Sequence, residues 1–203
     1  MGTVFENIDQ RLHDWIESQS LFFVGTAPLG KRGRVNVSPK GPIGALRVLD
    51  ERTVAYLDVV GSGAETIAHL RENGRIVVML CAFRGPPKIV RIHGRGRVLL
   101  PGTAEFRGLL RRARFVDLGI PESRRAIIVI DVERVADSCG YGVPQMRFVK
   151  DRDQMKRLCA HKLTVEGPST FTRYVAARNA KSIDGLPALD PKSAPRPRSR
   201  TKR

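Results

Sequence analysis

The sequence of 203 residues contains few cysteines and no long apolar run. Cys81, Cys139 and Cys159 are odd in number and form no CxxC pair, which argues against a disulfide framework or a zinc knuckle. The longest apolar run, 76–83, is far shorter than the roughly 20 residues of a membrane-spanning helix. The N-terminus also lacks the basic and apolar regions of a secretory signal. We therefore expect a cytoplasmic protein that does not cross a membrane.

The motifs of several enzyme classes are also missing. The chain has no GxxxxGK[ST], HExxH or GxSxG motif, which argues against phosphate-loop, zincin and hydrolase chemistry. No GxGxxG follows a predicted strand, so a Rossmann fold is not expected. His13, His69, His93 and His161 show no metal-ligand spacing, and no pair of carboxylates stands out. We expect neither a metal site nor a hydrolase.

Positive charge, in contrast, is abundant, with a formal net charge of +16. The segment 191–203 is rich in Pro, Ser and Arg and carries six basic residues and no acid, so the rest of the chain has a charge of +10. Such a segment cannot bury apolar area, and we expect a disordered tail. The tail serves either solubility or weak, salt-sensitive contact with nucleic acid. The basic remainder suits an anionic small ligand as well as a polyanion.

Hydrophobic periodicity predicts one mainly β domain with a few helices. Helices are expected over 7–18, 62–73, 103–114 and 169–180. Strands are expected over 21–27, 34–37, 48–49, 53–59, 75–83, 88–100 and 126–136. Six or seven strands joined mostly by short turns predict a closed antiparallel barrel.

Local patterns refine these elements. The strand over 75–83 is apolar on both faces, which predicts a central position in the sheet. The strand over 88–100 alternates apolar with basic residues, and its Gly94 and Gly96 predict sharp curvature.

Helix and strand ends have signals of their own. Ser62 and Glu65 have the spacing of a capping box, which predicts a helix start at Ser62. Pro39 is expected to end the strand that begins at Arg34.

Two short segments have the residue types of a phosphate site. In the first, Ser38 and Lys40 present a hydroxyl and an ammonium group, and Gly41 lets a ligand approach the backbone. The second, 61–66, opens a predicted helix whose free N–H groups and dipole suit an anion. Each segment can equally be structural, as an exposed turn or a capped helix start. The segment 138–144, with two glycines and a tyrosine, suits either a flat ligand or a plain turn.

Five ordered segments resemble a subgroup of the pyridoxamine 5′-phosphate oxidase-like family, whose members are FMN-binding split β-barrels. The segments are NVSPKG (36–41), YLDVVGSGAETIAHL (56–70), PPKIVRIHGRGRVL (86–99), SCGYGVP (138–144) and NAKSIDGLPAL (179–189). The resemblance covers about residues 5–190. It implies a six-stranded antiparallel split β-barrel with flanking helices over 1–147, and a C-terminal extension over 148–190 that packs on the barrel.

The resemblance also implies an FMN site at the interface of a homodimer. Lys40, Ser62 and Arg91 would hold the phosphate, and the partner's Tyr141 would contact the flavin ring. The full set implied to bind the cofactor is Ser38, Lys40, Gly41, Tyr56, Asp58, Ser62, Gly63, Glu65, Thr66, Lys88, Arg91 and Tyr141. We assign no catalytic residue, because the flavin itself carries the redox chemistry in such proteins.

Two departures from the family pattern argue against pyridoxamine phosphate as the substrate. The oxidases proper carry a basic pair after the serine of the second loop, where this chain has Gly63 and Ala64. Their C-terminal Trp and Arg have no counterpart, since the only tryptophan is Trp15. The leading hypothesis is an FMN-dependent oxidoreductase of undefined small-molecule substrate. The alternative is a protein that binds flavin, deazaflavin or haem for storage or sensing, without turnover.

Overall fold

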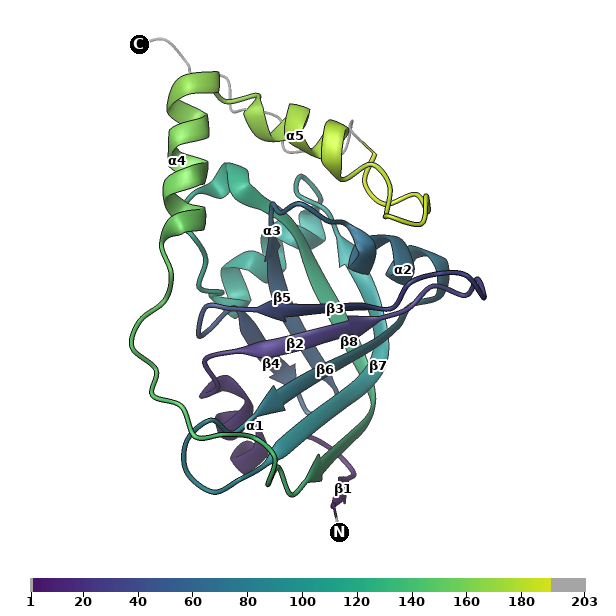
Figure 1. The fold of residues 1–203 in the computed structure, drawn as a ribbon, viewed down its shortest axis with the longest axis vertical. Helices are drawn as coiled ribbons and strands as arrows, with labels where there is room; N and C mark the ends of the chain where they lie inside the picture. The colour runs from purple at the N-terminus through teal and green to yellow at the C-terminus, as the bar shows by residue number, and fades with distance from the viewer. Residues whose placement is uncertain (1, 191–203) are drawn as a thin grey trace.

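A computed structural model of the chain describes residues 2–190 (Figure 1), so the predicted tail, 191–203, lies outside the described residues. The strands are β1 (Val4–Phe5), β2 (Phe22–Thr26), β3 (Asn36–Lys40), β4 (Leu46–Asp50), β5 (Thr53–Val59), β6 (Arg75–Cys81), β7 (Ile89–Leu99) and β8 (Arg124–Ser138). The helices are α1 (Gln10–Glu17), α2 (Glu65–Asn73), α3 (Ala104–Ala113), a 3-10 turn (Pro121–Ser123), α4 (Gln154–Glu166) and α5 (Thr170–Arg178). The prediction of a mainly antiparallel β fold with flanking helices is confirmed.

The strands form one curved antiparallel sheet in the order β3-β2-β6-β7-β8-β5-β4, with β1 added to β8. Two details of the predicted barrel are wrong. The described residues form eight strands rather than six or seven, and the sheet is open, because β3 and β4 are its edges and do not pair within the described chain. Polar side chains, rather than a backbone ladder, bridge the open side between β3 and β5.

The edge position of β3 also corrects the expected strand end at Pro39. Pro39 lies within β3 and pairs with Phe23 of β2. Proline has no N–H to donate and is tolerated on an edge strand, where one side of the backbone has no ladder to complete. The polar residue that follows, Lys40, is therefore still part of the strand.

The centre of the sheet agrees with the prediction. β6 lies between β2 and β7, as expected from a strand that is apolar on both faces. The register between β7 and β8 shifts at His93 and Gly94, which marks a β-bulge where glycine was expected to allow curvature. A Cβ atom on Gly94 would lie 2.2 Å from the carbonyl oxygen of Asp131, so only glycine lets the two strands approach this closely.

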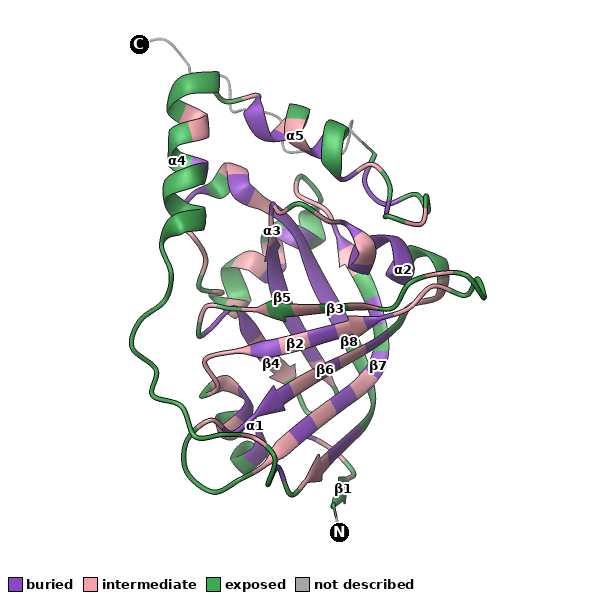
Figure 2. Ribbon diagram, viewed as in Figure 1, coloured by how far each residue is buried: buried purple, intermediate pink, exposed green. Residues whose placement is uncertain are grey.

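Helices α1 and α3 begin with side-chain caps and bury one face each. The Asp9 side chain accepts the backbone N–H of Leu12 at 2.7 Å, and the Thr103 side chain caps α3 in the same way. Helix α3 packs Phe106 and Leu109 against the outer side of β5 and β8, whereas the larger cluster fills the interior of the curved sheet (Figure 2).

The predicted capping box at α2 is wrong. The helix begins at Glu65, and within the described residues no side chain caps it. Ser62 stays exposed in the loop before the helix. The Glu65 carboxylate instead accepts the backbone N–H of Ile183 at 3.3 Å, so a contact distant in sequence replaces the local one.

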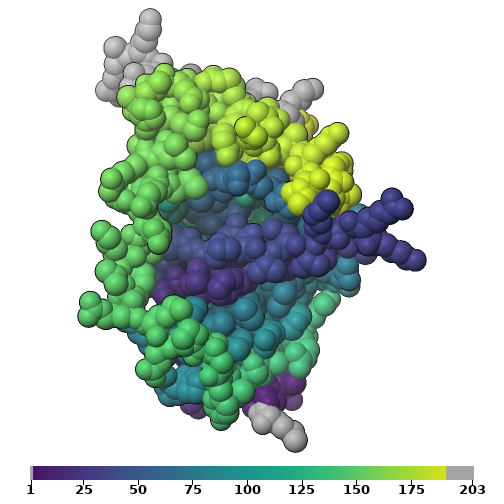
Figure 3. Space-filling model, viewed as in Figure 1, coloured from purple at the N-terminus to yellow at the C-terminus, as the bar shows by residue number. Residues whose placement is uncertain are grey.

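The chain after β8 reaches back to the barrel. The segment 139–153 runs along one side of the molecule to α4, a helix that the periodicity did not predict (Figure 3). Cys159 of α4 and Phe171 of α5 pack against Val60 and Ile120. Val175, Ala188 and Leu189 belong to the interior cluster of the barrel. Among the described residues, no helix is long and apolar enough to span a bilayer.

Candidate functional site

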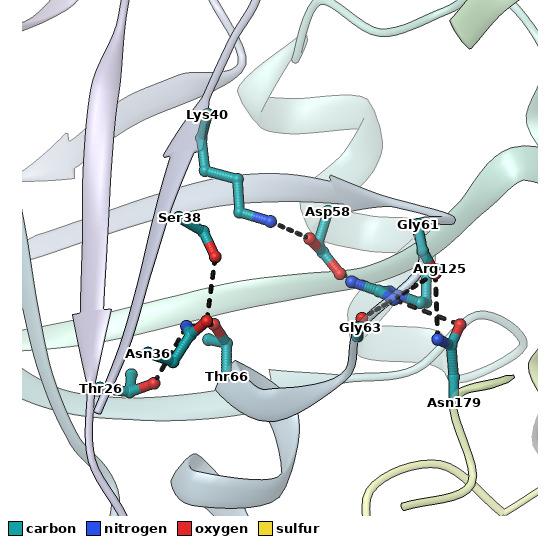
Figure 4. A network of polar contacts seen from close by, with 10 residues as sticks. All are labelled: Thr26, Asn36, Ser38, Lys40, Asp58, Gly61, Gly63, Thr66, Arg125 and Asn179. Atoms are coloured by element: carbon teal, nitrogen blue, oxygen red, sulfur yellow. Dashed lines mark hydrogen bonds and ion pairs between the residues drawn. The ribbon is translucent and has the colours of Figure 1, made fainter. Parts of the chain in front are cut away.

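A network of polar side chains crosses the open side of the barrel between β3 and β5 (Figure 4). Asn36, Ser38 and Lys40 alternate along β3 and share the inner face, because their cross-strand neighbours on β2 are buried. The Lys40 Nζ atom lies 3.1 Å from Oδ1 of Asp58 on β5. An ion pair thus connects β3 with β5 across the open side of the sheet.

Asp58 is the centre of this network. Its side chain is only 5% exposed, and its second oxygen accepts a hydrogen bond from the Arg125 Nε atom at 2.7 Å. Burial by itself raises the pKa of the Asp58 carboxyl, but the charges of Arg125 and Lys40 outweigh burial and hold that pKa below its usual value of 3.8. Asp58 therefore stays ionised and acts as a structural anion rather than as a proton donor.

Arg125 is a residue of the network that the sequence did not indicate. Asp58 pairs with Ala126 and Val59 pairs with Arg124, so Arg125 is the extra residue of a β-bulge. A bulge re-aims the side chain that it carries, and the Arg125 Nη1 atom donates to the Gly63 carbonyl at 2.6 Å. In the sequence, Arg125 is one of two adjacent arginines before an apolar strand, and nothing there distinguishes it from Arg124.

The loop between β5 and α2 takes its orientation from these contacts. The carbonyls of Gly61 and Gly63 accept hydrogen bonds from Asn179 and Arg125, so both face the interior. Both peptides that follow are trans, which points the N–H groups of Ser62 and Ala64 in the opposite direction. The Ser62 N–H belongs to an exposed residue beside the uncapped first turn of α2 and suits an anion, whereas Ala64 is buried.

Ser38 and Thr66 belong to a second part of the network, joined by Asn36. The Asn36 side-chain amide donates to the Thr66 hydroxyl at 3.1 Å and accepts from the Ser38 hydroxyl at 3.2 Å. The Thr26 hydroxyl lies 3.0 Å from Nδ1 of His69. His69 is fully buried, and burial lowers the pKa of its imidazole. Its Nε2 atom has no hydrogen-bond partner among residues 2–190.

Three predicted residues take other positions near this network. Tyr56 is fully buried in the core with its ring edge against Phe22, at 5.5 Å between ring centroids, and burial raises the pKa of its hydroxyl well above 10. Gly41 forms a cis peptide bond with Pro42 directly after β3. The Glu65 carboxylate lies beside Gly63, where a Cβ atom would come within 2.2 Å of it.

Lys88, Arg91 and Tyr141 form a separate group near the start of β7. The Arg91 Nη1 atom donates to the Ser138 hydroxyl at 3.1 Å. The Lys88 Nζ atom lies 5.0 Å from the centroid of the Trp15 ring, a cation–π contact. Tyr141 is 82% exposed. Within the described chain, the predicted residues therefore divide between the open side of the barrel and this region.

Lys88 and Tyr141 line a groove of about 1130 Å³ between α1, the turn before β7 and the segment after β8. Its lining is basic and partly aromatic, with Arg11, Trp15, Phe83, Arg84, Lys88, Tyr141, Arg147, Phe148 and Lys150, and with Asp137 as an acid. Such a lining suits an anionic ligand that has an aromatic part. Within residues 2–190, no group of three or more side chains has the arrangement of a metal site.

Comparisons with known proteins agree with this fold. The family model described as pyridoxamine 5′-phosphate oxidase matches residues 8–139. The pyridoxamine 5′-phosphate oxidase family protein ustO of Aspergillus flavus is 38% identical over 200 residues, which cover 93% of this chain and 78% of that protein. The crystal structure of a HupZ variant from Group A Streptococcus matches with a TM-score of 0.51 and 24% identity, over 64% of this chain and 99% of that chain, which shows a shared fold. The chain therefore belongs to the pyridoxamine 5′-phosphate oxidase family.

Proposed function

We propose that this protein binds FMN at the loop between β5 and α2 and acts as an FMN-dependent oxidoreductase on a small molecule. The observation that carries the proposal is the orientation of this loop in a member of this family. The Gly61 and Gly63 carbonyls are turned inward, and the N–H of the exposed Ser62 points away from the interior beside the first turn of α2. Backbone N–H groups at such a position bind phosphate well.

The residues present fit a phosphate, although few of them are cationic. The Lys40 ammonium has three N–H donors and gives one to Asp58, which leaves donors for a ligand. Arg125 is committed to Asp58 and to the Gly63 carbonyl. Because Gly63 and Ala64 stand where the family's oxidases carry a basic pair, we expect backbone N–H groups, the Ser62 hydroxyl and Lys40 to hold the phosphate.

A bound flavin would supply the redox chemistry, and the protein would supply binding and orientation. Asp58 stays ionised between two cations, so it offers no proton to a substrate. The residues of the chain therefore act by holding the phosphate, fixing the loop and shaping the surface next to the flavin.

The test is a flavin-binding and reduction experiment. The purified protein is incubated with FMN, freed of unbound ligand and measured by absorbance, and we expect close to one flavin per subunit. We then expect a reduced nicotinamide to bleach the flavin and oxygen to restore it. Lys40→Ala should lower FMN affinity by about tenfold, the effect of one charged hydrogen bond. Lys156→Ala, an exposed lysine on α4, is the control.

Each other outcome assigns a different function. A flavin that is retained but never reduced supports storage or sensing. If the protein does not retain flavin but binds a deazaflavin or haem, that compound would replace FMN as the proposed cofactor. Failure to bind any of the three would end the proposal.

We also propose a homodimer, because the predicted residues fall into two groups within one subunit. Lys88 and Tyr141 lie in the groove, away from the Lys40–Asp58 pair, and a second copy would let both groups face one flavin. The outer face of β3 and β2 offers a contact surface, since Val37 is 64% exposed. Sedimentation should give a dimer that Val37→Glu weakens. Val165→Glu, at a 67% exposed valine of α4, is the control. A monomer at micromolar concentration would refute the dimer.

A cytoplasmic location is part of the same proposal. Cys81, Cys139 and Cys159 are all free thiols, which is usual in a reducing compartment. Alkylation of the protein taken directly from cells and denatured should label three thiols. Labelling of fewer thiols would argue against the cytoplasm.

A further inference from the structure

Asn179, the residue that follows α5, is completely buried against the loop between β5 and α2. Its side-chain amide donates to the Gly61 carbonyl at 3.0 Å, and its side-chain oxygen accepts from Arg125 at 3.2 Å. Its backbone N–H donates to the Val175 carbonyl, and its backbone oxygen accepts from Leu189. Both ends of the side chain and both backbone groups thus have partners, which fixes Asn179 in a single orientation.

Asn179 and Arg125 hold two carbonyls of the same short loop. Arg125 binds the Gly63 carbonyl, Asn179 binds the Gly61 carbonyl, and the two side chains bind each other (Figure 4). If the Gly61 carbonyl rotated outward, the buried Asn179 side-chain amide would lose its acceptor, which costs about 1–3 kcal/mol. Arg125 would still donate to the Asn179 side-chain oxygen if the Gly63 carbonyl turned, so Asn179 depends on this loop more than Arg125 does. The N–H of Ser62, which follows the Gly61 carbonyl across a trans peptide, is therefore held away from the interior before any ligand arrives.

The chain after Asn179 makes a second attachment beside the same loop (Figure 1). The Ile183 N–H donates to the Glu65 carboxylate at 3.3 Å, at the first residue of α2. The Asp184 carboxylate accepts from the backbone N–H and the guanidinium of Arg34, at 2.7 and 2.6 Å. Residues 179–184 thus contact the loop, the start of α2 and the segment before β3.

We infer that Asn179 is a positioning residue of the phosphate subsite. Through Asn179, the C-terminal extension orients the loop of the cofactor site. The inference rests on the proposed flavin function. Asn179 does not touch the ligand in this arrangement. It sets phosphate affinity by orienting the loop, in a chain whose loop does not carry the basic pair of the family's oxidases.

The test compares FMN with riboflavin, which has the same ring system and no phosphate. Wild type should bind FMN more tightly than riboflavin. Asn179→Ala should weaken FMN binding about tenfold, as expected for the removal of one hydrogen bond, and should leave riboflavin binding within about twofold. Asn179→Asp keeps the acceptor for Arg125 and removes the donor to Gly61, so it should show the same selective effect.

Asn73→Ala is the matched control. Asn73 also lies at the end of a helix, and its side-chain amide donates to the Ala27 carbonyl at 3.0 Å, outside the loop. This variant should keep the wild-type ratio of the FMN and riboflavin affinities. An equal loss of affinity for both flavins in Asn179→Asp, or an unchanged ratio in both Asn179 variants, would overturn the inference.

A titration with inorganic phosphate separates this inference from the proposed function. The amide NMR signal of Ser62 should shift with phosphate in wild type and should shift less in Asn179→Asp. Phosphate binding without flavin binding would reject the proposed function and keep the role of Asn179. A wild type in which the Ser62 signal does not respond would overturn that role.

Discussion

At the scale of single residues, a row of charged side chains connects β3, β5 and β8 at the open side of the sheet. Asp58 and Arg125 are 5% and 6% exposed, and the partly exposed Lys40 completes a row of three charges. A buried ion pair stabilises a fold only when both partners and their hydrogen bonds are present, because each charge has been removed from water. Removing one member of this network should therefore lower the free energy of unfolding, because its partner stays buried without a counter-charge.

Replacing Asp58 by alanine should be strongly destabilising. The substitution leaves the buried Arg125 guanidinium without its anion, and we expect the free energy of unfolding to fall by about 3–5 kcal/mol. Urea denaturation followed by circular dichroism measures the change. Glu133→Ala removes a surface ion pair with Arg95, both 57% exposed, and should change the free energy by less than about 1 kcal/mol. Equal losses of stability in the two variants would contradict the importance of burial.

Two histidines whose pKa values are lowered should make the protein less stable in mild acid. Burial lowers the pKa of His69 below 6.5, so between its folded pKa and 6.5 the unfolded chain binds a proton that the folded chain does not. Stability is therefore complete above pH 6.5 and falls as the pH decreases below it. Burial lowers the pKa of His93 as well, which adds to the decrease.

The measurement is the thermal midpoint at pH 7.5 and pH 5.5. His69→Gln should reduce the difference between these midpoints, because the variant has no imidazole at this position to protonate. His161→Gln, at an exposed position on α4, should leave the difference as in wild type. The role of His69 is refuted if both variants behave alike.

At the scale of elements, local signals placed most strands and helices but not all of their ends. The caps of α1 and α3 come from side chains adjacent to each helix. The start of α2 was misplaced because Glu65 contacts Ile183, which lies 118 residues away. Helix α4 was not predicted because, apart from Cys159, it buries no residue and so has no clear apolar stripe. Element ends thus depend on what the element packs against.

A pair of glycine substitutions tests the bulge between β7 and β8. Gly94→Ala forces a Cβ to within 2.2 Å of the Asp131 carbonyl and should destabilise by about 1–3 kcal/mol. Gly108→Ala lies in α3 with nothing within 4 Å of the new Cβ, and should stabilise by about 0.5–1 kcal/mol. Thermal unfolding of both variants measures these two changes in stability. A Gly94 variant as stable as wild type would mean that the bulge tolerates a side chain.

At the scale of the whole molecule, the curved sheet is filled on one side and covered on the other. The interior cluster lies within the curve of the sheet, and α3 covers the outer side of β5 and β8. The C-terminal extension contributes Val175 and Leu189 to the interior cluster, although these residues follow the last strand. Positive charge is spread over the chain and is densest in 191–203.

Removing 191–203 should weaken any binding to duplex DNA without changing the fold. The deletion lowers the net charge from +16 to +10. If the tail binds phosphates, the slope of log K against log salt should become shallower by about 0.9 for each phosphate that the tail no longer neutralises. Fluorescence anisotropy with a labelled duplex at several salt concentrations measures the slope. An unchanged slope would assign the binding to the barrel and leave the tail without a role in it.

The elements that depend on near neighbours could be predicted from the sequence. The apolar run at β6 predicted a central strand, and five short segments indicated the family. The short turns and alternating strands predicted the antiparallel arrangement, although the sheet is open rather than closed. These signals are readable because periodicity and turn chemistry act within a few residues.

The assembly of the site depends on contacts that form only in the folded chain. A β-bulge turns Arg125 toward Asp58, and Asn179 reaches the Gly61 carbonyl from 118 residues further along the chain. The Lys40–Asp58 ion pair, and not a backbone ladder, bridges the open sheet. None of these interactions has a local signal, because a buried charge or amide is satisfied by whichever partner the completed fold brings within hydrogen-bonding distance.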